Sequence, residues 1–359
     1  MDKSGSAFLP RILFFNVNGS GMGHLNRCLA YARQLREQVC PVFFSLSSAI
    51  EIIEEMGFKA DYFVSHNWSR ASSSEWNREL CLRLGLMLER VRPAAVVFDG
   101  TWPYQGFIHA CREYGKAKII WSYRGLHQAD KIKPFLYPDM FSMIIRPGEV
   151  GDEFGFEDGD FGCPQVRVPP VCVLKDDELL DKVQAREAMG LSENGRYALF
   201  SLGAGNINDV EGVGVGLIQQ LQNAGFEVIW VNNPISVKDV VLPEGVRPVS
   251  AYPLVRYLRA FDVFIGASGY NTCCEIVQAQ VPALLVPNTD TKLDDQNRRA
   301  YLVARHAPII VSRCGNESER EASVRELLQL ADMHIDRKCL VPMNGAALAA
   351  DTILALANR

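Results

Sequence analysis

The sequence lacks any apolar run long enough to cross a bilayer, since the longest, such as 197–202 and 283–286, are far too short. Its first residues, MDKSGSAFLPR, contain neither the apolar core nor the cleavage site of a secretory signal peptide. It also lacks a basic excess, because 37 Lys and Arg face 42 Asp and Glu, a net charge of −5. These absences argue against a membrane-spanning protein and against binding to a nucleic-acid backbone. We therefore expect a cytoplasmic protein.

Metal-binding cysteine patterns are missing as well. None of the ten cysteines forms a CxxC pair, and only Cys273 and Cys274 are adjacent. A zinc site needs clustered ligands at set spacings, so we expect no metal site and reduced, mostly buried thiols. Apolar residues make up 48% of the chain and charged residues 22%, an ordinary globular mixture. The length of 359 residues suggests two domains.

Short runs of β-branched and aromatic residues alternate with helix-length segments along the whole chain. Apolar strands separated by helices are typical of parallel sheets covered on both faces, and two such series predict two doubly wound α/β domains. The helix after the first strand has an apolar stripe, Leu25, Leu29, Ala32 and Leu35, at helical spacing. The predicted strands are 11–17, 41–46, 61–65, 94–98, 118–122 and 143–146 in the first half, and 197–202, 227–231, 246–249, 263–265, 283–286 and 308–311 in the second.

A linker is predicted between the two halves. Residues 149–162 are rich in Gly, Asp and Glu, and Pro169-Pro170 follow, a composition typical of loops. The segment 176–189 then resembles the first helix of the second half. We therefore place one domain at 1–168 and another at 169–340.

A glycine-rich loop, NVNGSGMGH over residues 16–24, follows the first predicted strand. Glycines let the backbone approach a ligand closely, and the N-terminus of the next helix favours negative charge. A plain strand-to-helix turn is the alternative. A nicotinamide dinucleotide site is disfavoured, because the second strand ends in Ser45-Leu46-Ser47-Ser48 without an acid to bind the ribose.

His24 and Asp99 each follow the end of a predicted strand. Ligands in open α/β sheets bind at the carboxyl ends of strands, and doubly wound order puts the fourth strand beside the first, where Asp99 can reach His24. A carboxylate that holds one imidazole nitrogen raises the basicity of the other, and such a pair can deprotonate a hydroxyl. The alternatives are a structural histidine and an aspartate that caps the next helix.

The second half contains a dense polar motif, GASGYNTCCE, after the strand at 263–265. Ser268 and Gly269 at a helix start make a natural diphosphate cradle. Glu275 can accept hydrogen bonds from both hydroxyls of a ribose, or it can complete a capping box with Thr272.

Two further polar segments stand beside this motif. Gly203 and Gly205 form another glycine turn after a strand, and the simplest interpretation is a turn alone. Asp295 and Gln296, in LDDQNRRA, can bind sugar hydroxyls or belong to a solvated polar face.

The segments GSGMGHLNRCLAYARQL and GASGYNTCCEIVQAQVPALLVPN, with DDQNRRA after them, resemble the glycosyltransferases of family 28. The resemblance covers most of the chain. It implies a GT-B fold, with two Rossmann-like doubly wound domains facing across a cleft, the acceptor in the first, the nucleotide in the second, and a helix at 341–359 that packs back on the first. It also implies that a sugar is transferred, with inversion, from a nucleotide diphosphate donor to a hydroxyl, and it favours uridine as the base of the donor. The same resemblance implies that the reaction needs no cofactor and no essential metal.

The same resemblance assigns roles to residues. His24 is the catalytic residue, and Asp99 supports it, because RPAAVVFDGTWPYQ looks like the corresponding strand of plant glycosyltransferases. The turn at Ser250 and Ala251 reads the base, and Asp295 with Gln296 reads the donor sugar. The implied donor-binding residues are Gly21, Gly23, Gly203, Gly205, Ser250, Ala251, Ser268, Gly269, Tyr270, Asn271, Glu275, Asp295 and Gln296.

Other functions remain open on the same fold. The run GHLNRCL at 23–29 also resembles the UDP-sugar hydrolase of pseudaminic acid synthesis, in which water replaces the acceptor. A UDP-sugar 2-epimerase and a non-catalytic sugar-nucleotide binder are further alternatives. The expected partners are a nucleotide-sugar donor and a small-molecule, lipid-linked or glycan acceptor, with no nucleic acid. The segment 131–137 mixes basic and aromatic residues, which allows peripheral contact with the inner face of a membrane.

Overall fold

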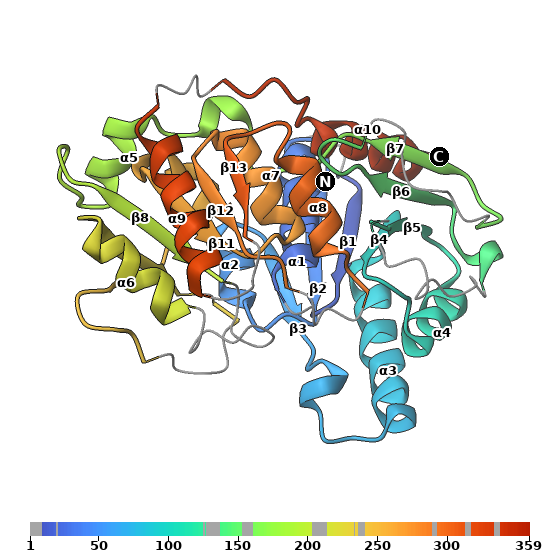
Figure 1. Cartoon of the computed structure of the whole chain (residues 1–359). Coiled ribbons are helices and arrows are strands. Elements are labelled where there is room, and N and C mark those ends of the chain that lie inside the picture. The colour runs from blue at the N-terminus through green and yellow to red at the C-terminus, as the bar shows by residue number, and fades with distance from the viewer. Residues whose placement is uncertain are drawn as a thin grey trace.

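The structure is a computed structural model that describes residues 9–18, 21–124, 126, 137–152, 161–202, 214–232, 234–235, 241–288, 293–312, 317–333 and 338–359. It confirms two α/β halves, each built on one parallel sheet (Figure 1). The sheet orders are β3-β2-β1-β4-β5-β6-β7 and β10-β9-β8-β11-β12-β13. Gly203, Gly205 and the segment 131–136 lie outside the described residues.

The strands follow the predicted apolar runs closely in most of the chain. The first sheet contains β1 (Arg11–Asn16), β2 (Cys40–Ser45), β3 (Lys59–Tyr62), β4 (Ala95–Asp99), β5 (Lys118–Ser122), β6 (Met143–Pro147) and β7 (Gln165–Val168). The second contains β8 (Tyr197–Ser201), β9 (Glu227–Val231), β10 (Arg247–Val249), β11 (Val263–Gly266), β12 (Ala283–Leu285) and β13 (Ile309–Val311).

Helices cover both faces of these sheets. They are α1 (Gly23–Leu35), α2 (Ile50–Glu55), α3 (Ser73–Val91), α4 (Gln105–Tyr114), α5 (Lys182–Ala188), α6 (Val215–Asn223), α7 (Tyr270–Ala279), α8 (Gln296–Val303), α9 (Glu317–Ala331) and α10 (Gly345–Ala357). The predicted apolar stripe of α1 is buried along its whole length. A capping box between Ser72 and Glu75 starts α3, which packs against α4.

Two elements differ from the sequence-based expectation. The strand β7 lies near the end of the segment predicted as linker, where it extends the first sheet beside β6. The predicted helix at 176–189 is instead a short 3₁₀ turn at Asp176–Glu178 followed by α5, because the side chain of Asp181 accepts from the Gln184 backbone and starts the helix there.

The last helix lies against the first half of the chain. Its residues contact α1, β4, β5 and β7, and Figure 1 shows α10 beside β6 and β7. Gly345 begins α10 where no side chain fits, since an added Cβ would lie 1.9 Å from the carbonyl oxygen of Pro169. The exact domain limits remain a prediction.

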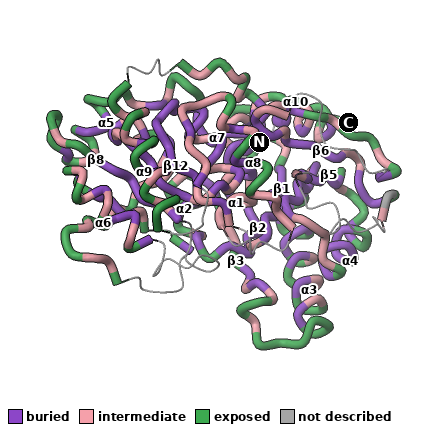
Figure 2. Tube along the Cα trace, in the orientation of Figure 1, coloured by how far each residue is buried: buried purple, intermediate pink, exposed green. Residues whose placement is uncertain are grey.

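The apolar core is continuous between the two halves. One buried cluster runs from β1 and α1 through the segment 171–174 to α7 and β12 (Figure 2). Separate clusters lie under α3 and α4, and between the second sheet and α6 and α9. The halves therefore meet over a packed contact between α1 and α7, which fixes the surroundings of the candidate site.

Candidate active site where the two halves meet

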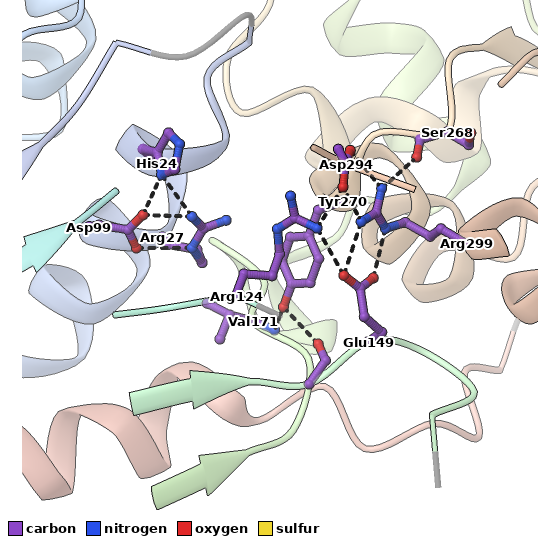
Figure 3. Close-up of polar contacts among 11 residues, drawn as sticks. His24, Arg27, Asp99, Arg124, Glu149, Val171, Ser268, Tyr270, Asp294 and Arg299 are labelled. Carbon is purple, nitrogen blue, oxygen red and sulfur yellow. Dashed lines mark hydrogen bonds and ion pairs between the residues drawn. The ribbon is translucent and has the colours of Figure 1, made fainter. Parts of the chain in front are cut away.

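Topology brings His24 and Asp99 together. The strands β1 and β4 pair in parallel with Asn16 opposite Asp99, and α1 starts a few residues after β1. The two side chains therefore meet at the carboxyl edge of the sheet, with His24 Nδ1 at 2.7 Å from Asp99 Oδ1 (Figure 3). Asp99 has no exposed surface, and the His24 side chain is 21% exposed. Among the described residues, the structure gives His24 Nε2 no hydrogen-bond partner.

Sequence reasoning assigned no role to Arg27, which completes this group. Its Nε donates to Asp99 Oδ2 at 2.9 Å and its Nη2 donates to Asp99 Oδ1 at 2.6 Å. The guanidinium is buried, and its Nη2 lies 3.0 Å from His24 Nδ1. The signal was present in the sequence, because residues three apart on a helix share a face.

The charges of this group fix the protonation states. Burial alone would raise the pKa of Asp99, but the Arg27 charge and the His24 hydrogen bond outweigh it and lower that pKa. Burial lowers the pKa of His24, and the charges of Arg27 and Arg124 add to this against the opposing effect of Asp99. An ionised Asp99 can only accept, so the hydrogen on neutral His24 lies on Nδ1 and the lone pair on Nε2.

Two helix N-termini near this group are uncapped. Neither α1, which follows Met22, nor α7, which follows Gly269, has a side-chain cap or an acid in its first turn. An added Cβ on Gly21 would meet nothing within 4 Å, and one on Gly23 or Gly269 would meet only side-chain atoms at 3.8 and 3.9 Å. Packing does not demand these glycines, and the space beside them is open to a ligand. Exposed helix N–H groups in such space can bind an anion.

Tyr270 is buried and connects the two halves of the chain through hydrogen bonds. Its hydroxyl donates to the Gly148 carbonyl at 3.1 Å and accepts from the Val171 N–H at 3.0 Å. The guanidinium carbons of Arg27 and Arg124 lie 5.6 and 5.3 Å from the centre of its ring, within cation–π range. The predicted donor-binding Tyr270 thus contacts the first half of the chain through its ring and its hydroxyl (Figure 3).

A buried ionic network lies beside Tyr270, and sequence analysis missed it. Arg299, with a side chain 1% exposed, binds Glu149 at 2.7 and 3.0 Å and Asp294 at 2.6 and 2.9 Å. Arg124 contacts Glu149 at 3.0 Å and Asp294 at 2.9 Å. Arg124 follows β5 and Glu149 follows β6. The expectation that functional residues follow the carboxyl ends of strands, which identified Asp99, therefore applies to them as well. The network joins residues 150 and 170 positions apart, which no local pattern reveals.

The predicted sugar-reading residues shape the start of α8. The Asp295 side chain accepts from the Arg298 N–H at 3.0 Å and caps the helix. Gln296 Oε1 accepts from the Asn288 N–H at 3.0 Å. The buried Ser268 hydroxyl donates to the Gln296 carbonyl at 2.9 Å, which ties the turn before α7 to α8. These side-chain groups are engaged within their own half.

Glu275 lies in a different environment from His24. The helix α7 begins at Tyr270, so Glu275 is in its second turn, and the alternative capping box with Thr272 does not form. Glu275 lines a cavity of about 10 Å³ together with Asn271 and with Asn26 of α1. That volume is about the minimum for one water molecule. Burial raises the pKa of Glu275 to about 8.

The turn predicted to read the base follows β10 and approaches α1. Ser250 is exposed and Ala251 is half-buried. The next residue, Tyr252, donates its hydroxyl to Asn26 Oδ1 at 3.0 Å. The site residues therefore form two groups, one around His24 and Asp99 and one around Glu275 and Asn271, and α1 contributes His24 to the first and Asn26 to the second.

Two other features are absent from the described parts of the chain. No cluster of three His, Cys, Asp or Glu side chains is placed to hold a metal ion there. Over the same residues, no helix has the length and apolar character needed to cross a membrane. Of the nine described cysteines, Cys28, Cys111, Cys172, Cys273 and Cys274 are buried, and Cys40 is exposed.

Known proteins resemble this chain in sequence and in fold. The profile of the "Glycosyltransferase family 28 C-terminal domain" matches residues 249–336. The UDP-N-acetylglucosamine–N-acetylmuramyl-(pentapeptide) pyrophosphoryl-undecaprenol N-acetylglucosamine transferase of Bacillus licheniformis is 25% identical over 354 residues, covering 91% of each chain.

Solved structures extend this likeness to the whole fold. The glycotransferase of kitacinnamycin has a TM-score of 0.66 at 15% identity, covering 98% of this chain and 100% of that one. MurG of Acinetobacter baumannii has a TM-score of 0.55 at 12% identity, covering 96% and 99%. The chain is a glycosyltransferase with the GT-B fold, and its residues 249–336 match the C-terminal domain of family 28.

Proposed function

We propose that the protein transfers a sugar from a nucleotide diphosphate donor to an acceptor hydroxyl, with inversion and without an essential metal, and that His24 is the base. The observation that carries this proposal is the 2.7 Å contact between His24 Nδ1 and a buried Asp99. It leaves Nε2 as a lone-pair acceptor at the carboxyl edge of the sheet.

The chemistry follows from this geometry. His24 Nε2 accepts the proton of the acceptor hydroxyl as its oxygen bonds to the anomeric carbon, and the bond from that carbon to the diphosphate oxygen breaks. Asp99 stabilises the imidazolium that forms, as a carboxylate behind a catalytic histidine does. Direct displacement by the acceptor inverts the anomeric centre, because the bond forms on the face opposite the leaving group.

The departing diphosphate needs positive charge that is already in place. The uncapped N-termini of α1 and α7, with open space beside Gly21 and Gly269, supply N–H groups and helix dipoles aimed at an anion. We propose Gly21, Gly23, Gly269 and the backbone of Ser268 as diphosphate contacts. Glu275 with Asn271 is our proposed ribose site, and Ser250 with Ala251 our proposed base-reading turn.

The relatives suggest the substrates. The curated relative is named for transfer of N-acetylglucosamine from its UDP conjugate to a lipid pyrophosphate acceptor. By analogy we propose a UDP-sugar donor and an acceptor of the lipid-linked kind, reached from the cytoplasmic side of a membrane. Asp295 and Gln296, at the start of α8, are proposed to read the sugar.

Two measurements test the proposal together. A thermal-shift panel of nucleotide sugars identifies the donor, because a ligand that binds only the folded state raises the melting temperature. Turnover of that donor is then followed with and without acceptors in the wild type, in His24→Ala, and in His109→Ala as a control on an exposed histidine of α4.

The outcomes separate the candidate functions. We expect H24A to lose turnover by about 10²-fold or more, the lower end for removing a general base, while its donor-induced thermal shift stays nearly unchanged. Normal turnover in H24A would refute the role of His24. Full-rate release of free sugar without acceptor would identify a hydrolase, and a thermal shift with no turnover of any donor would identify a binder.

A further inference from the structure

Arg27 occupies a position that a histidine–aspartate pair does not by itself require. Asp99 already has a partner in His24, yet both of its oxygens are also bound by Arg27 at 2.9 and 2.6 Å. A two-point contact fixes the plane of a carboxylate, which a single hydrogen bond to an imidazole does not. The carboxylate therefore points at His24 Nδ1 because Arg27 holds it there.

The charge of Arg27 answers a second need of the site. A buried carboxylate beside an imidazole favours the imidazolium, and an imidazolium has no lone pair with which to accept a proton. A buried guanidinium with one nitrogen 3.0 Å from His24 Nδ1 opposes that effect directly. The charged groups that act on His24 are Asp99, Arg27 and Arg124, and Arg27 itself faces Asp99 and the neutral phenols of Tyr31 and Tyr270.

We propose that Arg27 is a positioning residue that orients Asp99 and keeps His24 in its neutral form, so that it sets the pH range in which His24 serves as a base. The inference rests on the proposed function of His24. The Arg27 side chain is 3% exposed and lies between Asp99 and the ring of Tyr270. It acts through the other two side chains and not on substrate.

The test reads His24 directly in the whole protein without donor or acceptor. Histidine selectively labelled at Cε1 is titrated by NMR, and H24Q identifies the His24 signal among the six histidines. Arg27→Gln removes the charge, and Arg27→Lys keeps it but cannot bind both Asp99 oxygens. We expect R27Q to raise the His24 pKa by about one unit or more, at the low end of what a neighbouring charge produces.

R27K separates charge from orientation. Its His24 pKa is expected to stay within about half a unit of wild type, well below the ~1–3 units that a full neighbouring charge produces. Its turnover is expected to fall nonetheless, because the carboxylate loses its two-point support. In R27Q the acidic limb of kcat/KM moves to higher pH with the His24 titration.

Two results would overturn the inference. One is a folded R27Q in which His24 titrates as in wild type, and the other is an R27K that shifts the titration as far as R27Q. If R27Q does not fold, R27K still tests the inference through its His24 pKa and its turnover. A wild type without turnover would instead contradict the proposed function and leave the titration result standing.

Discussion

Arg299 is the residue whose removal tests the buried network most directly. Arg299→Met keeps the approximate volume and removes the hydrogen bonds to Glu149, to Asp294 and to the Ser268 carbonyl, the last at 3.1 Å. Glu149, whose side chain is 1% exposed, would then share Arg124 with Asp294 as its remaining partner in the network.

The magnitude follows from this burial. Removing one partner of a buried ion pair costs about 3–5 kcal/mol, and because Arg124 still contacts both acids, we expect the low end, about 3 kcal/mol of unfolding free energy. With a urea m-value of about 3 kcal/mol/M, the unfolding midpoint falls by about 1 M. The assay is urea unfolding followed by far-UV circular dichroism, and the m-value of the variant is compared with that of the wild type.

The control is an exposed ion pair in the same protein. Arg90 and Asp61 form one with side chains 64% and 41% exposed, and Arg90→Gln is expected to cost no more than about 1 kcal/mol. The double variant E149Q with R299M should cost less than the sum of the single changes, because each removes the same contact. The reasoning is refuted if the R299M midpoint shift is no larger than that of R90Q.

Three more substitutions probe the contact between the halves by the same unfolding assay. Burial raises the pKa of Glu275 to about 8, whereas an unfolded glutamate has a pKa of about 4.3. Between these two pH values the folded state holds a proton that the unfolded chain has released, so the free energy of unfolding falls as the pH rises. Glu275→Gln should therefore lose less stability than wild type between about pH 5 and about pH 8.5. Tyr270→Phe should cost about 1–3 kcal/mol, because it leaves a buried backbone N–H without its acceptor. Gly345→Ala should cost at least about 1–3 kcal/mol, because its Cβ would meet Pro169 O, whereas Gly85→Ala, where a Cβ meets nothing within 4 Å, should gain up to about 1 kcal/mol. Equal midpoints for the two alanine variants, or a pH dependence that E275Q leaves unchanged, would contradict these arguments.

The sequence predicted the parts of the fold whose signal is local. Apolar strands and the helical stripe of α1 are periodic, and the doubly wound order then placed Asp99 beside the end of β1. The strand β7 was missed because QVRV alternates polar and apolar residues at a sheet edge, after a segment rich in Gly, Asp and Glu. Its four residues are the shortest alternation that marks a strand, and they give no apolar run, so the loop-like composition before them outweighed the signal.

Residues of the candidate site could be predicted only where they follow a strand or belong to a sequence motif. His24 and Asp99 each follow a strand and each belong to a motif. Arg124 and Glu149 also follow strands, but their partners Asp294 and Arg299 lie in the other half, and a charged residue alone in sequence does not reveal its counter-ion. Tyr270 and Asp295 also make contacts that the motif alone does not reveal, because the Tyr270 hydroxyl bonds to Gly148 and Val171 and the Asp295 carboxylate caps α8.

The balance of charge at the site connects these observations. The buried ion pairs join Arg27, Arg124 and Arg299 with Asp99, Glu149 and Asp294. Such a set tolerates burial because each charge has an opposite neighbour, whereas an imidazolium at His24 would share its one carboxylate, Asp99, with Arg27. In the proposed reaction His24 gains its proton as the diphosphate gains negative charge. The leaving group then supplies a second anion beside Asp99, so proton transfer to His24 is most favourable at the moment the bond from the anomeric carbon to the diphosphate breaks.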